Sequence, residues 1–178
     1  LGDIFTAPAA GSILKAIRTL SHDAGVLCIA TNHAGDVLNF ELVSELAELE
    51  GIKTRQLYIS DDVDSSEERE ERRGIAGVTL VLKILSAARD AGLSLEALLS
   101  LGESINNNLS TASVTTSPAY IFENGKQAYD LPDGTVEYGM GFNGEMGKER
   151  TNLPSANSLM EKLTEPLILD LQLKADDE

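Results

Sequence analysis

Basic residues are scarce in this chain, and this scarcity limits the functions open to it. The 178 residues include 14 Lys and Arg against 29 Asp and Glu, which gives a net charge of −15 and a pI near 4.4. A field of that sign repels nucleic acid and anionic membranes. We therefore expect no nucleic-acid binding. A basic face on a partner protein would suit this charge, although a well-hydrated surface explains it more simply.

Cysteine and long apolar runs are also nearly absent. Cys28 is the sole cysteine, so no internal disulfide can form, which is compatible with a reducing compartment. Its place in a short apolar run predicts core packing. No run approaches the roughly 18 consecutive apolar residues of a membrane span, and no secretory signal pattern opens the chain. We expect a soluble, cytoplasmic protein without membrane contact.

The composition that remains is ordinary for a globular protein, with 42% hydrophobic and 24% charged residues. A strand at 26–30, a helix at about 37–50 and a strand at 54–59 form a βαβ unit. This pattern predicts an α/β fold, layered, with a mainly parallel sheet flanked by helices. Further helices are expected from about Pro8 and at 74–91, 94–109 and 159–171, and further strands at 112–116 and 136–140.

The helical periodicity predicts which side chains face inward. In the first helix these are Ile13, Leu14, Ile17 and Leu20; in the helix at 37–50 they are Phe40, Val43, Leu46, Ala47 and Leu49, with Gly51 as its stop. The helix at 74–91 is apolar on more than one face, which predicts burial between the sheet and another layer.

Both ends of the sequence look cut. Leu1 is not an initiator Met and stands in what should be the middle of a fold, and the chain stops at Glu178, where a further strand is expected. We expect a fragment, truncated at both ends, of one domain. Its first lobe would run from about 1–135, and a second lobe would start in about 136–178.

The most informative segment is the polar loop that ends the apolar run at 26–30. Its last residues, Gly35 and Asp36, precede an amphipathic helix, so one carboxylate stands at the end of a buried strand. Ligands of open α/β sheets collect at that edge, where helix N-termini point amides into the crevice. Asp36 is therefore a candidate for catalysis and substrate binding. The spacing equally suits a structural N-cap.

A run of charged residues at 60–73 follows the second strand and contains almost no apolar side chain. Asp61, Asp62 and Asp64 resemble part of a calcium loop, but the glycine and the terminal glutamate of an EF-hand are missing. We predict a solvated surface loop without a metal. Arg72 and Arg73 are expected either to face a partner subunit or to pair with neighbouring glutamates.

Four glycines stand among residues 139–147, directly after a predicted strand. Glycine lets backbone amides approach a small ligand closely. The spacing from Gly139 to Gly144 matches a dinucleotide motif, but no strongly periodic helix follows directly and no βαβ unit encloses it. The segment is therefore predicted to form a tight turn rather than a dinucleotide site.

Several motifs, taken together, resemble one family, the DhaK-type subunit or domain of dihydroxyacetone kinase. They come in family order and span nearly the whole chain, which makes the resemblance specific although each motif alone is weak. The matching segments are 2–8 (Gly-Asp-Ile-Phe-Thr-Ala-Pro), 35–41 (Gly-Asp-Val-Leu-Asn-Phe-Glu), 50–52, 72–77 (Arg-Arg-Gly-Ile-Ala-Gly) and 137–145 (Glu-Tyr-Gly-Met-Gly-Phe-Asn-Gly-Glu), with Gly147, Glu149 and Arg150.

The resemblance implies an α/β protein that forms a homodimer and holds dihydroxyacetone while a phosphoryl group arrives from ATP or ADP. That nucleotide, with Mg, is expected on a separate DhaL-type subunit or domain, so no cofactor is expected on this chain. In the family, the aspartate of the Gly-Asp-Val motif contacts a substrate hydroxyl, and Asp36 occupies that position. Its implied chemistry is to accept the hydroxyl proton as the oxygen attacks phosphorus.

The chain departs from the family pattern at two site positions. Asn143 stands where members carry a histidine that binds the substrate carbonyl covalently, and a carboxamide can only hydrogen-bond there. Thr31 aligns with a lysine of the loop after the strand. The family's second catalytic histidine, in a Gly-Gly-Gly-Ser-Gly-His-Glu-Pro segment, would lie before Leu1.

Three further residues are candidates for substrate contact. Phe5 matches the wall of the family's pocket, with core packing as the alternative, and backbone amides near Gly141 could bind a hydroxyl or carbonyl oxygen. His33 lies in the same loop as Asp36 and would supply a proton donor or a polar contact, unless it is an ordinary loop histidine.

Three hypotheses about function follow from the resemblance. The leading one is the substrate-binding part of a dihydroxyacetone kinase of glycerol metabolism, active together with its nucleotide-bearing partner. The second is a catalytically inactive paralogue that senses a ligand or acts as a coactivator. The third is a kinase for another small ketone or polyol, held without a covalent bond by Asp36, Asn143 and the amides near Gly141.

Overall fold

The computed structural model describes residues 6–122 and 124–174. The chain divides into two compact units. The first unit comprises Leu1–Asp61 and Arg73–Leu109, and the second unit comprises Asp62–Arg72 and Ser110–Glu178. These units do not follow the lobe boundary expected near residue 135, so the division into family lobes stays a prediction.

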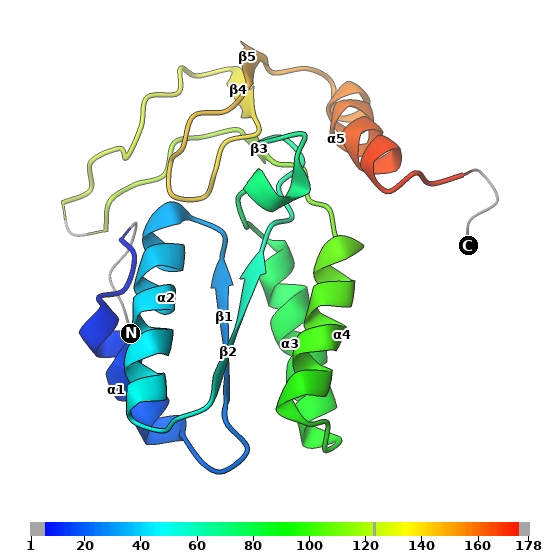
Figure 1. The fold of residues 1–178 in the computed structure, drawn as a ribbon. Helices are drawn as coiled ribbons and strands as arrows, with labels where there is room; N and C mark the ends of the chain where they lie inside the picture. Colours follow the sequence, from blue (N-terminus) through cyan, green and yellow to red (C-terminus); the bar gives the residue numbers. More distant parts are fainter. Residues whose placement is uncertain (1–5, 123, 175–178) are drawn as a thin grey trace. The chain divides into compact units, whose positions relative to one another are not determined.

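Two parallel strands form the centre of the first unit (Figure 1). β1 (Val26–Thr31) pairs with β2 (Thr54–Ile59) in a register that joins Val26 to Thr54 and Thr31 to Ile59. Parallel strands need a crossover, and α2 (Ala34–Leu49) supplies it. The carboxyl ends of both strands therefore meet at one edge. The predicted α/β class, with a parallel sheet flanked by helices, is confirmed.

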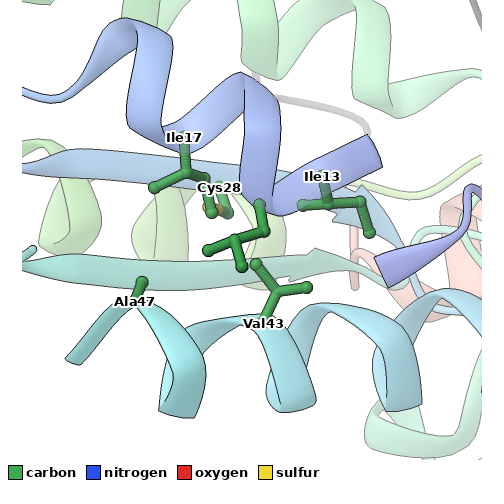
Figure 2. Packing of buried hydrophobic residues seen from close by; sticks show 6 residues of the cluster. Ile13, Ile17, Cys28, Val43 and Ala47 are labelled. Carbon is green, nitrogen blue, oxygen red and sulfur yellow. The ribbon is translucent and has the colours of Figure 1, made fainter. Parts of the chain in front are cut away.

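One face of the strand pair is covered by α1 (Ala10–Leu20) and α2, and the packing is apolar (Figure 2). Ile13 and Ile17 of α1 point toward Val43 and Ala47 of α2, and Cys28 of β1 lies among them. The predicted core position of Cys28 is confirmed. Burial raises the pKa of its thiol to about 11, so the group is an inert packing residue rather than a nucleophile.

The other face is covered by α3 (Gly77–Asp90) and α4 (Leu95–Asn107). Alternate strand residues point this way, so the second apolar cluster contains Leu57, Ile59, Val81, Leu85 and Leu98. Ser94 caps α4, because its hydroxyl accepts a 3.3 Å hydrogen bond from the Ala97 amide.

Some predicted inward positions are wrong. Leu20 and Leu49 are exposed, since each is the last residue of its helix, where the helix passes the end of the packed layer. On α3 only the stripe with Val81 and Leu85 is buried against the strands. The predicted second covered face of this helix is also wrong, because its remaining large apolar side chains are exposed in the described chain: Leu80, Leu82 and Ile84.

The second unit is antiparallel. β4 (Thr135–Tyr138) lies between β3 (Val114–Thr115) and β5 (Glu149–Asn152), and α5 (Ala156–Asp170) follows them. A short 3-10 turn, η1 (Arg69–Glu71), belongs to the same unit. Gly125 and Gly134 lie in turns of this unit with positive φ angles of 65° and 72°. The sequence analysis missed β5, whose four residues are all polar.

Candidate functional site

Asp36 lies in the first turn of α2, just after the carboxyl end of β1. The helix begins at Ala34 rather than at the predicted residue 37, and His33 is its N-cap without a side-chain cap hydrogen bond. The Val37 amide donates to the His33 carbonyl at 2.9 Å. The alternative reading of Asp36 as the N-cap is therefore wrong. Its charge lies instead within the first turn, where the helix dipole favours a negative group.

The carboxylate of Asp36 is half-buried and makes no hydrogen bond or ion pair with any described residue. Desolvation raises its pKa above the ordinary value, and the nearby His33 opposes part of that rise. A carboxylate with a raised pKa and open hydrogen-bonding capacity is a stronger proton acceptor than an exposed one. These properties suit a general base at the ligand-binding edge of a parallel sheet.

A loop at residues 74–76 packs directly onto this edge. The His33 ring Nε2 lies 3.1 Å from the Gly74 carbonyl oxygen. A Cβ at residue 74 would lie 2.9 Å from Thr31 atoms and would collide with the Ile59 carbonyl. Only glycine allows this approach. Thr31 is thus the strand end onto which the loop packs, in addition to being a predicted substrate contact.

Asp61, which follows β2, is completely buried and holds this loop from the other side. Its two carboxylate oxygens accept hydrogen bonds from the amides of Ile75 and Gly77, both at 2.8 Å. Ser60 beside it is fixed by Asn106 of α4, whose side-chain oxygen accepts from the Ser60 amide at 3.0 Å. Asp61 therefore orders the start of α3.

The prediction of a solvated loop at 60–73 is wrong at both of its ends. Ser60, Asp61 and Asp62 are buried, and so is Arg72. Their polar groups are satisfied by protein rather than by water: Asp61 by amides, and Arg72 by Asp170 of α5. The side chain of Arg72 thus forms an ion pair with a carboxylate far away in sequence, and it also donates to the Glu67 backbone carbonyl at 3.3 Å. Asp61 was missed although a polar residue after a buried strand was the very signal that pointed to Asp36.

Asn143 belongs to the second unit, in the turn between β4 and β5. Its backbone amide donates to Glu145 Oε2 at 3.1 Å, and its side-chain nitrogen donates to Glu145 Oε1 at 3.2 Å. The Gly141 amide donates to the Glu145 carbonyl, and the Gly144 amide to the Gly141 carbonyl, both at 3.0 Å. The predicted tight turn is present, and Glu145 orients the Asn143 carboxamide within it.

Glu137 of β4 anchors the far side of this turn. It accepts a 2.7 Å hydrogen bond from the Gly147 amide and pairs with Arg150 of β5 at 2.6 Å. Burial alone would raise the pKa of Glu137, but the bonds from Gly147 and Arg150 outweigh it, so the pKa lies below its ordinary value. Glu137 is therefore an ionised anchor of the glycine-rich segment.

The predicted site residues fall into two groups. Thr31, His33 and Asp36 lie together at the strand edge of the first unit, whereas Gly141 and Asn143 lie in the turn of the second unit. Phe5 lies outside the described residues. Within the described chain, no cluster of three His, Cys, Asp or Glu side chains could hold a metal, and no helix is long and apolar enough to span a membrane.

Comparison with known proteins shows the family of this chain. The Dak1 domain model matches residues 1–178. The chain belongs to the Dak1 domain family. It is 39% identical over 178 residues to the dihydroxyacetone-binding subunit DhaK of PTS-dependent dihydroxyacetone kinase 1 from Listeria innocua, covering 99% of this chain but 54% of that protein. The chain thus spans about half the length of this relative.

Two solved structures share the Dak1-domain fold. The native dihydroxyacetone kinase of C. freundii superposes with a TM-score of 0.86 at 29% identity, covering 96% of this chain and 31% of that one. The dihydroxyacetone kinase operon co-activator DhaQ superposes with a TM-score of 0.85, also at 29% identity, covering 95% of this chain and 53% of that one. A kinase and a co-activator therefore match this Dak1 domain almost equally well.

Proposed function

We propose that this Dak1 domain is the dihydroxyacetone-binding part of a DhaK-type kinase subunit, with Asp36 as its catalytic base. The observation that supports this most directly is the Asp36 carboxylate itself. It lies at the carboxyl end of a parallel strand, in the first turn of a helix, with a raised pKa and with no hydrogen bond or ion pair to residues 6–122 or 124–174. The name of the L. innocua relative supplies the substrate class.

In the proposed reaction, a hydroxyl oxygen of the substrate attacks phosphorus as its proton passes to Asp36. A phosphorus–oxygen bond forms to the substrate while the bond to the phosphoryl donor breaks. The donor is ATP or ADP with Mg²⁺ on a DhaL-type partner, which supplies the phosphoryl group and neutralises its charge. We propose that the protein is a cytoplasmic homodimer that binds the substrate and presents it to that partner. The nucleotide is bound by the partner and not by this chain.

Asn143 would hold the substrate by hydrogen bonds alone. Its nitrogen is delocalised into the amide and is not a nucleophile, and Glu145 already orients that nitrogen. Thr31 and Phe5 are proposed as further contacts to the small ketone, whereas the Gly141 amide already donates to the Glu145 carbonyl and the His33 ring nitrogen lies against the Gly74 carbonyl. Positioning by such groups supplies much of the barrier reduction in phosphoryl transfer.

The test is turnover of the full-length protein with its nucleotide-bearing partner, using dihydroxyacetone as acceptor. Asp36→Asn keeps the size of the side chain and removes the base, so kcat should fall by roughly 10²–10⁴-fold, the usual worth of a general base. Asp90→Asn, at an exposed aspartate at the end of α3, is the matched control and should retain full activity. Full turnover by Asp36→Asn would remove Asp36 from catalysis.

The second candidate is a co-activator that binds the ligand without phosphorylating it. The structural match to DhaQ and the asparagine at position 143 favour it. Isothermal titration with dihydroxyacetone separates the two candidates. The co-activator is supported if the full-length protein binds dihydroxyacetone saturably but phosphorylates no small ketone or polyol with any nucleotide-bearing partner. Phosphorylation that depends on Asp36 supports the kinase subunit.

A further inference from the structure

The side chain of His33, the N-cap of α2, joins the start of that helix to a distant loop of the first unit. His33 does not cap α2 with its side chain, and the first two helical residues, Ala34 and Gly35, have no polar side chain to do so. Instead, the His33 ring reaches across to the Gly74 carbonyl oxygen at 3.1 Å. The ring therefore joins the start of α2 to a loop 41 residues away in sequence.

The acceptor of this hydrogen bond is held firmly. Gly74 lies against Thr31 and the Ile59 carbonyl so closely that no side chain fits. The next residues are fixed by the buried Asp61, which accepts hydrogen bonds from the amides of Ile75 and Gly77 at 2.8 Å. The Gly74 carbonyl thus has a defined position relative to the carboxyl ends of β1 and β2.

A carbonyl oxygen only accepts, so the His33 Nε2 must bear the hydrogen. The His33 carbonyl accepts a 2.9 Å hydrogen bond from the Val37 amide, and Asp36 lies between these two residues in sequence. A shift of His33 would therefore move the first turn of α2 together with the Asp36 carboxylate. The ring also lies close enough to Asp36 to affect its ionisation.

We propose that His33 is a positioning residue: its Nε2–H, bound to the Gly74 carbonyl, sets the first turn of α2 and the direction of the Asp36 carboxylate. The consequence for catalysis rests on the proposed function, in which Asp36 is the base. The role differs from the substrate contact expected for His33 from its sequence position, because the ring nitrogen is used within the protein.

The kinetic test uses the full-length protein with its nucleotide-bearing partner and dihydroxyacetone. His33→Leu removes the ring N–H, whereas His33→Gln places an amide N–H at a similar distance from the backbone as Nε2. We expect His33→Leu to lower kcat at least about 10-fold with KM changed less than about 3-fold, since displacement of a catalytic group costs rate. His33→Gln should restore kcat to within about 3-fold, and His22→Leu, at the exposed second histidine, should match the wild type.

Three kinetic outcomes would overturn the proposal: a rise in KM at unchanged kcat, which marks a substrate contact; an equal loss in His33→Leu and His33→Gln; or no change in either variant. Thermal unfolding of each variant, followed by circular dichroism, identifies a loss that comes from unfolding. His33→Gln then decides the outcome, because a folded variant that keeps the N–H must keep the rate.

A second measurement separates failure of this proposal from failure of the proposed function. NMR of this chain reads the tautomer of the His33 ring and the hydrogen exchange of the Val37 amide, and neither needs activity. We expect the Nε2–H tautomer, and Val37 exchange about 10-fold faster in His33→Leu but not in His33→Gln. Unchanged Val37 exchange in His33→Leu overturns the positioning role, whereas full turnover by Asp36→Asn overturns only the function assigned to Asp36.

Discussion

The two units of this Dak1 domain are stabilised by different chemistry. In the first unit, two apolar clusters pack on either face of a parallel strand pair, and its ion pairs, such as Arg18 with Glu50, are exposed. In the second unit, the described buried apolar residues are few, and α5 buries none. Buried or nearly buried carboxylates are paired there instead: Asp64 with Lys148, Glu137 with Arg150, and Asp170 with Arg69 and Arg72.

Because of this difference, we expect the two units to respond differently to pH, to salt and to core substitutions. Apolar burial depends little on pH or salt, whereas a carboxylate held by guanidinium groups loses its contribution when it is protonated. The buried carboxylate of the first unit, Asp61, is satisfied by backbone amides rather than by basic side chains. Acid should therefore weaken the second unit first, and core substitutions should weaken the first unit.

The largest effect is expected from Leu85→Ala, which opens a cavity in the cluster between β2, α3 and α4. Leu85 is buried, so the free energy of unfolding should fall by roughly 2–5 kcal/mol. Hydrogen exchange should show the loss of protection in the first unit. Leu80→Ala on the same helix is the control, because Leu80 is 53% exposed and should cost less than about 0.5 kcal/mol. Equal losses would mean that this cluster is not the core.

The next largest effect is expected from Asp170→Asn in the second unit. Hydrogen bonds from Arg72, together with Ser110 and Arg69, hold the pKa of Asp170 at about 2. A carboxyl pKa lowered this far by its partners contributes about 2 kcal/mol to the free energy of unfolding. Its loss should appear as faster exchange of second-unit amides. Asp133→Asn, at an exposed turn residue, should leave exchange unchanged.

The pH dependence should distinguish the two units by sign. Because the pKa of Asp170 is lowered, its contribution is complete above about pH 4 and is lost as the pH falls through about 2. The pKa of Asp36 is raised by desolvation, so acid instead relieves a penalty in the first unit as the pH falls through its folded-state pKa. Exchange measured from pH 6 to 2 should show second-unit protection fall first. An Asp170→Asn protein that loses protection as steeply as the wild type would contradict this assignment.

The smallest effect is expected from Arg18→Gln, which removes the exposed pair between α1 and Glu50 at the end of α2. Exposed ion pairs are screened by water and salt and contribute little. The melting temperature should change by less than about 1 °C, with no further change in high salt. A larger shift would show that the first unit also depends on ion pairs.

The sequence predicts the βαβ unit well because each element there follows a single dominant pattern. β2 has the predicted bounds, and β1 exceeds its prediction by one residue, since apolar runs end at clear turn residues. α3 begins three residues later than predicted, because Gly74, Ile75 and Gly77 are engaged by contacts with residues far away in sequence. β5 has no apolar alternation, so its pairing with β4 cannot be read locally.

The sequence predicts which site residues follow a strand, but it does not predict the hydrogen bonds that these residues make with distant parts of the chain. The place of Asp36 after β1 follows from the strand pattern, but the helix begins three residues earlier than predicted, which is nearly one helical turn. Asp61 was predicted to be a solvated loop residue because its hydrogen-bond donors, the amides of Ile75 and Gly77, lie 14 and 16 residues away in sequence. The distant partner of His33 was invisible for the same reason.

The close packing of Gly74 has a consequence for how this edge can vary. Its neighbours are the Ile59 carbonyl and the Thr31 strand end, so the spacing between the loop and both strands is a backbone dimension. Surrounding side chains can change without altering that spacing, whereas Gly74→Ala would change it at once. Side chains at this edge can therefore be substituted to change its chemistry, while Gly74 alone keeps the spacing between the loop and the ends of β1 and β2.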